Sequence, residues 1–287
     1  MFAFPAGMRL HSFEYDGLPR LGAEVKGQLV DLQFASRYLI QRNGPFEGSS
    51  QPLPGDLLTL LRSGERALKL AHAAEALGSK RLALPVGERL HYTFDEVRLL
   101  PPVRHPGKII VLSGQAHAKF STTLTGSGGL VPKRHGATGL EASASVALTL
   151  GQPLRSASVE QALRAVFGWT LALDICQPDM LGAEPLLAHN FDGATPVGPC
   201  VVTSDIILGV PTFDVCLEVD ERQVSSCDAR EVLIRAGEKL ARLSEAMTLA
   251  IGDLILLPVG RSIPLSPGAR VVLRQEKIGI LECRIGS

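Results

Sequence analysis

The sequence predicts an α+β protein that is mostly β, with a small N-terminal α/β unit over residues 1–100 and a larger strand-rich unit over residues 101–287. Three observations support this fold class. Two helical patterns fall in the first hundred residues, short apolar runs bounded by turn residues dominate the rest, and a proline-rich segment at 100–107 separates the two. A chain of 287 residues is long enough to bury a core in each unit.

The expected N-terminal elements are a hairpin followed by two helices. Apolar residues alternate at 21–25 and 28–32 on either side of a short turn, which is typical of paired strands. Helical patterns follow at 56–61 and 65–77, and Gly78 stands where a helix commonly ends.

The second unit begins with a buried type of strand at 108–112. Two further strands are expected at 145–150 and 169–176. Between them Ser158 is followed three residues later by Gln161, the capping-box signature of a helix start.

Two more segments complete the prediction. Apolar residues recur at helical spacing from about 231 to 249, which indicates an amphipathic helix. Residues 123–139 contain five glycines and predict a mobile flap.

Composition excludes several classes of function. The 29 basic and 29 acidic residues give a formal net charge of zero and no basic run, so nucleic-acid binding has no support. No apolar run approaches the ~20 residues of a membrane-spanning helix, and the N-terminus lacks the pattern of a secretory signal. The five cysteines are an odd number without a C-x-x-C pair, which favours a reducing compartment, and we expect a cytoplasmic protein.

Five segments in order resemble the fumarylacetoacetate hydrolase (FAH) family. The family's domain-opening segment is similar to residues 101–110, and its G-Y-x-x-x-x-D-x-x-x-R-D strand is similar to 168–179. Its K-S-F-D-x-x-x-P-x-G-P loop is similar to 187–199. Residues 219–223 and 249–255 resemble V-N-G-x-x-R-Q and L-x-x-G-D-x-I. Together these segments cover the chain from about residue 101 onward.

The resemblance implies a mixed β-sheet roll of the FAH type, preceded by the small N-terminal domain, and a homodimer. It also implies chemistry on a small 2-oxo acid that carries a second carbonyl. In the family a divalent cation is held by an E-x-E pair and an aspartate, and a His-x-x-Glu dyad on a lid moves protons.

The expected metal ligands are mostly replaced in this chain. Ser143 and Ser145 stand where the two glutamates belong, and only Asp174 keeps its place. One carboxylate and two hydroxyls supply too little charge for Mg²⁺, so we expect no cofactor. Mg²⁺ or Mn²⁺ is expected only if Glu141, two residues earlier on the same strand face, substitutes for the lost ligands.

The acid–base residues are also altered. His117 matches the lid histidine, whereas Phe120 takes the place of its glutamate. His189 replaces a substrate-binding lysine, and Asp179 remains although the arginine before it is absent. A histidine can exchange protons near neutral pH, so proton transfer remains available to this set.

Three hypotheses follow. We favour a divergent enzyme with metal-independent proton transfer on a small oxo-acid or 1,3-dicarbonyl-like compound, by tautomerisation, cyclisation, dehydration or decarboxylation. A non-catalytic paralogue, which binds a ligand or scaffolds a partner, is the alternative. A Mg²⁺-dependent C–C hydrolase rescued by Glu141 is the third. For the favoured hypothesis the catalytic residues are His117, His189 and Asp174, and the substrate-binding residues are Ser143, Ser145, Phe120 and Asp179.

Overall fold

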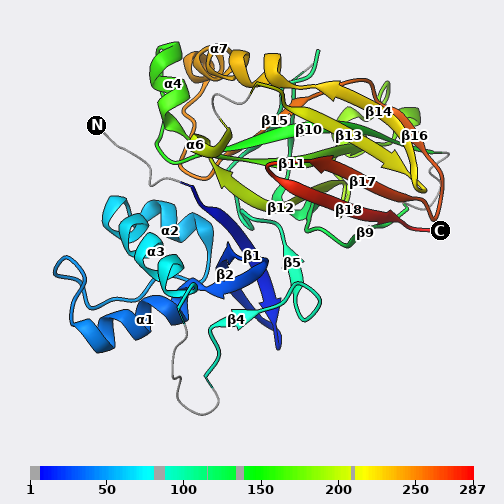
Figure 1. Cartoon of the computed structure of the whole chain (residues 1–287). Coiled ribbons are helices and arrows are strands. Elements are labelled where there is room, and N and C mark those ends of the chain that lie inside the picture. The colour runs from blue at the N-terminus through cyan, green and yellow to red at the C-terminus, as the bar shows by residue number, and fades with distance from the viewer. Residues whose placement is uncertain (1–6, 81–87, 115, 134–138, 208–210) are drawn as a thin grey trace.

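The computed structural model describes residues 7–80, 88–114, 116–133, 139–207 and 211–287. It contains two β-sheets with helices against them, so the predicted mostly-β α+β class is confirmed (Figure 1). Among these residues, none of the helices has the length and apolar character needed to cross a membrane. All five cysteines are free.

The predicted hairpin and two helices are present in the N-terminal part. Its elements are β1 (Arg9–Tyr15), β2 (Leu18–Val25), β3 (Gln28–Asp31), α1 (Leu32–Asn43), α2 (Leu57–Arg62), α3 (Glu65–Leu77), β4 (His91–Tyr92) and β5 (Arg98–Leu100). The elements β1, α1, β4 and β5 were not predicted, and α1 begins at Leu32, which was expected to end a strand. Strands β2 and β3 form the expected hairpin. Helix α2 starts after Asp56, whose carboxylate accepts the Thr59 N–H, and α3 has the expected bounds.

The remaining elements are mainly strands. They are β6 (Ile109–Val111), β7 (His117–Lys119), η1 (Ser121–Thr123), β8 (Leu124–Thr125), β9 (Gly129–Val131), β10 (Leu140–Leu150), α4 (Val159–Ala165), β11 (Val166–Cys176), η2 (Pro178–Met180), α5 (Pro185–His189), β12 (Thr195–Thr203), α6 (Ser204–Ile207), β13 (Asp214–Val219), β14 (Arg222–Asp228), α7 (Arg230–Ala246), β15 (Leu254–Pro258), β16 (Ile263–Leu265), β17 (Arg270–Gln275) and β18 (Gly279–Ile285).

Local signals placed some of these boundaries well and others less well. The Ser158–Gln161 capping box is formed at the start of α4. Helix α7 ends earlier than predicted because the backbone of Met247 is extended. The glycine-rich stretch contributes β8 and β9 to the two sheets, and its residues 134–138 lie outside the described part of the chain.

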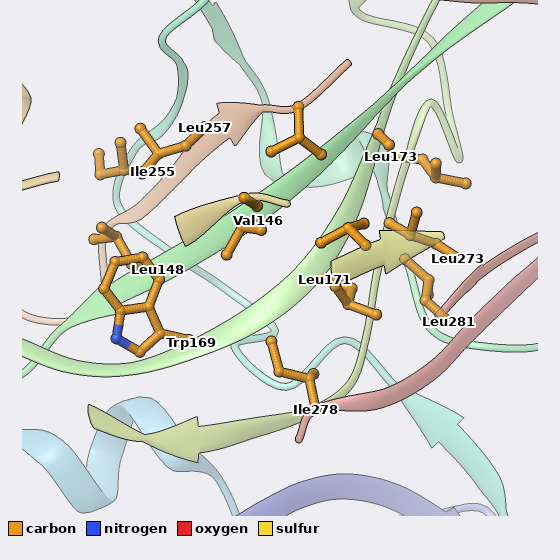
Figure 2. Close-up of a cluster of buried hydrophobic side chains, with 14 of the residues drawn as sticks. Val146, Leu148, Trp169, Leu171, Leu173, Ile255, Leu257, Leu273, Ile278 and Leu281 are labelled. Carbon is orange, nitrogen blue, oxygen red and sulfur yellow. The ribbon is translucent and has the colours of Figure 1, made fainter. Parts of the chain in front are cut away.

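The main core lies between the two sheets. The larger sheet has the order β4-β3-β2-β1-β12-β11-β10-β15-β6-β7, and the smaller has the order β14-β13-β17-β18-β9. Figure 2 shows Trp169 of β11 beside Leu148 of β10, and Leu171 of β11 near Val146 of β10, with Leu273 and Leu281 of the smaller sheet next to Leu171. Burial of these apolar side chains holds the sheets together.

The opposite face of the larger sheet carries the polar positions of interest. Side chains alternate along a strand, so when Leu171 and Leu173 enter the core, Ala172 and Asp174 point the other way. Ser143 pairs with Asp174 across the β10–β11 ladder, and Ser145 pairs with Ala172. Cross-strand partners share a face, so both serines lie on the Asp174 side.

The larger sheet curls back on itself. Strands β10, β15 and β6 lie between β11 and β7 in hydrogen-bonding order, yet Lys119 of β7 contacts Asp174 of β11. The chain then leads through η1 to β8, which pairs with β12 in parallel. This closure produces the roll that the family resemblance implies.

The N-terminal strands extend this same sheet. Strand β1 pairs with β12 through Arg9 and Leu10, and the N-terminal apolar cluster includes Phe167 and Val201 from β11 and β12. Residues on both sides of position 100 therefore share a sheet and a hydrophobic cluster.

Candidate functional site

Asp174 is the centre of a cluster of titratable side chains where the sheet closes. Lys119 Nζ lies 2.6 Å from Oδ1, and His117 Nε2 lies 3.2 Å from Oδ2. His189 Nδ1 lies 3.8 Å from Oδ1. The structure thus brings together the three residues predicted to be catalytic, and it adds a lysine.

Asp174 is ionised in this environment. Its side chain is 7% exposed, and burial alone raises the pKa of a carboxyl group. The Lys119 ammonium and the contacts with the two histidines outweigh burial and hold the pKa of Asp174 well below its usual range. A permanent negative charge therefore faces both imidazole rings.

Lys119 is wholly buried, and all its donors have partners. Its Nζ donates to Asp174 Oδ1 at 2.6 Å, to the Ala194 carbonyl at 2.9 Å and to the Ile175 carbonyl at 3.2 Å. Burial lowers the pKa of Lys119, and the carboxylate beside it acts in the opposite direction. Three acceptors match the three N–H donors of an ammonium, so we describe the pair as ionic.

The two histidines are stacked on each other. Their ring centroids are 3.7 Å apart and the ring planes differ by 24°. His117 comes from β7 and His189 from the end of α5, and their side chains are 19% and 15% exposed. Both rings therefore lie beside the Asp174 carboxylate, which stabilises a positive charge on either of them.

Asn190 links β7 to α5 through hydrogen bonds and so fixes the stacking of His117 on His189. Its Oδ1 accepts the Phe120 N–H at 2.7 Å, and its Nδ2 donates to the Ala118 carbonyl at 3.2 Å. Nδ2 also donates to the Leu186 carbonyl of α5 at 3.0 Å. The Asn190 side chain therefore forms hydrogen bonds with the backbone on both sides of Lys119, and these bonds hold β7, the strand that carries His117.

The serines and Glu141 lie on the same strand face as predicted, with different surroundings. Ser143 lines a groove, whereas Ser145 is fully buried and its hydroxyl has no hydrogen-bond partner among the described residues. Glu141 pairs across the ladder with Cys176, and its carboxylate accepts the Ser262 hydroxyl at 3.0 Å.

Phe120 and Asp179 lie outside the cluster. The Phe120 side chain is 54% exposed, and its backbone N–H is bonded to Asn190. Asp179 is exposed on η2. A substrate-binding role for these two residues stays a prediction.

A groove of about 850 Å³ opens beside the cluster. One wall is the segment before His117, and another is α7, which contributes Lys239 and Arg242. Neither of these basic side chains forms an ion pair with a described residue. The volume suits a small organic ligand, and the two charges favour an anionic one.

A divalent cation, which the family resemblance implies, does not fit this centre. Potential ligand atoms of His117, Asp174 and His189 lie within 4.8 Å of one another, so residues of a metal-binding type are present. However, an imidazole binds a metal through a nitrogen lone pair that lies in the plane of its ring. His117 and His189 are stacked, so their in-plane lone pairs run side by side and do not converge on one metal position.

Lys119 opposes such an ion as well. A metal about 2.1 Å from Asp174 Oδ1 would lie within about 5 Å of the ammonium, where charges of +2 and +1 repel by about 7 kcal/mol at an effective dielectric constant near 20. The Ser145 hydroxyl adds no charge to offset this repulsion.

Lys119 and Asn190 were missed from the sequence for different reasons. The family's His-x-x-Glu pattern directed attention to Phe120, three residues after His117. The segment is instead strand β7, in which residues two apart share a face, so Lys119 joins His117 at Asp174. The spacing of two between His117 and Lys119, with apolar residues before, between and after them, was a usable signal of a shared strand face. Asn190 acts through backbone contacts, which leave no sequence pattern.

The whole chain resembles known proteins in sequence and structure. It is 25% identical over 291 residues to an oxaloacetate tautomerase of Bacillus subtilis, covering 90% of this chain and 93% of the relative. A mitochondrial oxaloacetate tautomerase of Homo sapiens is 24% identical, with 80% and 79% covered. The fold matches maleylpyruvate hydrolase from Sphingobium sp. SYK-6 in complex with manganese(II) and pyruvate, with a TM-score of 0.74, 22% identity, and 97% and 99% covered.

The family model described as fumarylacetoacetate (FAA) hydrolase C-terminal matches residues 100–286. The match includes β6 to β18 and every residue of the cluster around Asp174. The curled sheet, the in-register Ser143–Asp174 pair and this match agree, and the chain belongs to the fumarylacetoacetate hydrolase family.

Proposed function

We propose that this protein catalyses keto–enol tautomerisation of a small 2-oxo acid without a metal ion. The observation that carries the proposal is the stacked pair of His117 and His189 against the ionised Asp174. This pair lies at the side of a groove whose basic residues form no ion pair within the described part of the chain. Two adjacent imidazoles can supply one base and one acid near neutral pH, which is what tautomerisation needs.

In the proposed reaction no atoms are gained or lost. His117, acting as the base, removes a proton from the carbon next to the ketone, and the C–H electrons form the new C=C bond as the carbonyl π electrons move to oxygen. His189, protonated, donates its proton to that oxygen. The return reaction exchanges the two roles, and Asp174 stabilises whichever ring is positively charged.

Lys239 and Arg242 would bind the carboxylate end of the substrate. They line the groove from α7, and Ser143 lines its floor next to Asp174 in the β10–β11 ladder. Charge-assisted hydrogen bonds from these side chains would orient the acid with its reacting carbon toward the histidines. Oxaloacetate is the first compound to test, because the relatives are named oxaloacetate tautomerases.

The test is the rate of enol-to-ketone conversion of oxaloacetate with a chelator in excess, followed by ultraviolet absorbance. We expect activity that the chelator does not reduce. His117→Ala and His189→Ala should each lower kcat by about 100-fold or more. The exposed His105→Ala is the matched control and should leave kcat unchanged.

The alternatives are distinguished by the same experiment. Tight binding of the oxo-acid without turnover would favour the non-catalytic paralogue. Activity that requires added Mg²⁺ and disappears in Glu141→Gln would favour the metal-dependent enzyme, and release of pyruvate from an acylpyruvate would identify it as a hydrolase. The hydrogen bond from the Ser262 hydroxyl to Glu141 does not support Glu141 as a metal ligand.

A cytoplasmic homodimer remains part of the proposal. The homodimer rests on the family resemblance and the compartment on the cysteine usage, and some of the relatives are named mitochondrial. Light scattering of the purified protein tests the dimer, since a monomer would give a mass of 30.6 kDa.

A further inference from the structure

We propose that the Lys119 ammonium is a built-in cation that takes the place of a divalent metal beside Asp174 and prevents such an ion from binding there. The three oxygens around Nζ are one carboxylate and two backbone carbonyls. These are the ligand types that hard cations take in proteins. The lysine therefore occupies a small oxygen-lined cation site with its own covalently attached charge.

The position of Lys119 is set by strand geometry. It lies two residues after His117 on β7, so both side chains project from the same face. Its neighbours on either side are held by Asn190, through the Ala118 carbonyl and the Phe120 N–H. A side chain fixed at both flanks and bonded at its end is poorly able to withdraw and admit another ion.

The charges of the neighbouring residues match a monovalent cation. Asp174 supplies one negative charge, which balances one ammonium. Ser143 and Ser145, on the same face of β10, are neutral. Glutamates at these two positions would leave a buried excess of negative charge that a lysine could not offset, so the serines and Lys119 form a consistent set.

Lys119 is a positioning residue in this proposal. Its side chain is 0% exposed, so it does not touch a substrate. It acts through Asp174, whose carboxylate it keeps ionised and whose orientation toward His117 and His189 it fixes. The role of Lys119 and the proposed function have only the absence of a metal in common. The role of Lys119 is tested by metal binding, which can be measured without any enzymatic activity.

The experiment is a Mn²⁺ titration followed by electron paramagnetic resonance, in which bound Mn²⁺ loses the signal of the free ion. Wild type should bind no Mn²⁺ at this centre. Lys119→Gln, which keeps hydrogen-bonding groups but removes the charge, should bind Mn²⁺ at least about tenfold more tightly than wild type. Adding Ser143→Glu to Lys119→Gln should strengthen binding further.

Two control variants locate the ion. Lys119→Arg keeps the charge and should behave as wild type, whereas Lys119→Gln with Asp174→Asn should lose the gained affinity. Because Lys119→Gln leaves Asp174 buried and unpaired, thermal melts are recorded in parallel. A variant unfolded without metal should be rescued by Mn²⁺ through binding to the folded state.

Mn²⁺ binding by wild type that Asp174→Asn abolishes would overturn the inference. The same conclusion would follow if Lys119→Gln showed neither new Mn²⁺ affinity nor a Mn²⁺-dependent rise in Tm. Absence of tautomerase activity in the wild-type protein would overturn the proposed function and leave the inference about Lys119 untouched. The two claims can therefore fail separately.

Discussion

Asp174 is paired with the buried Lys119 ammonium, and removing the Asp174 charge leaves this ammonium without its ionic partner. In Asp174→Asn the Lys119 ammonium stays in a site with no exposed surface, so the expected loss in the free energy of unfolding is about 3–5 kcal/mol at pH 7. Urea denaturation measures it, with the exposed Asp95→Asn as control. The double variant Asp174→Asn with Lys119→Met should recover much of the loss, because no unpaired charge remains. A fully additive double variant would contradict the ion pair.

Glu75 makes the stability of the protein depend on pH. Burial raises the pKa of this carboxyl from 4.5 to about 7, although His72 Nδ1 lies 3.3 Å away. Because the folded pKa lies above the unfolded one, the stabilisation is complete below pH 4.5 and is lost as the pH rises through 7. Glu75→Gln should therefore be more stable than wild type at pH 8, by about 1–2 kcal/mol because solvent partly screens this carboxylate, and equal to it at pH 4.

The control for this effect lies on the same helix. Glu65 of α3 is far more exposed, with 48% of its side-chain surface accessible, and its carboxylate pairs with Lys69 at the start of the helix. Glu65→Gln should therefore change stability in the opposite sense from Glu75→Gln, being less stable than wild type at pH 8 by about 0.5 kcal/mol or less and equal to it at pH 4. Denaturant melts of the three proteins at pH 4 and pH 8 make the comparison. A pH-independent effect of Glu75→Gln would show that burial of the carboxylate is not the cause.

At the scale of elements, the contact between β7 and α5 depends on one amide. Asn190→Ala removes three hydrogen bonds and should lower stability by about 2 kcal/mol. It should also speed hydrogen exchange at the Phe120 amide and lower kcat, because the histidines lose their fixed relation. Asn190→Asp keeps the acceptor for the Phe120 N–H but loses the donor to the Ala118 carbonyl. The exchange rate of the Phe120 amide in this variant should therefore lie between the rates in wild type and in Asn190→Ala. The exposed Asn43→Ala is the control.

Elements with strong local signals were predictable, and contacts that depend on the closed sheet were not. The capping box at Ser158 and the bounds of α3 follow from neighbouring residues, and both are correct. The placement of Ser143 beside Asp174 follows from strand pairing within one hairpin-like ladder. The meeting of Lys119 with Asp174 depends on the curl of a sheet in which three strands intervene, and no local pattern encodes that distance.

At the scale of the whole molecule, the intrinsic fluorophores are divided between its two parts. All three tyrosines lie within the first 100 residues, and the only tryptophan, Trp169, lies in the core between the sheets. Strand β1 pairs with β12, and the N-terminal cluster includes Phe167, so we expect one cooperative transition. Tyrosine and tryptophan fluorescence should give the same urea midpoint. An earlier tyrosine transition would show that residues 1–100 unfold as a separate domain.

The curl of the larger sheet has a consequence for the order of folding. Lys119 and Asp174 are 55 residues apart in the chain, and they meet only when the edge strand reaches β11. Until that moment both charges can stay hydrated, so the dehydration of the pair belongs to the final closure and not to the earlier pairing of β10 with β11. Substitutions at this pair should then mainly accelerate unfolding and change the refolding rate little, which stopped-flow measurements on Lys119→Gln can determine. We therefore expect the candidate site to be the last part of the roll to form and the first to open.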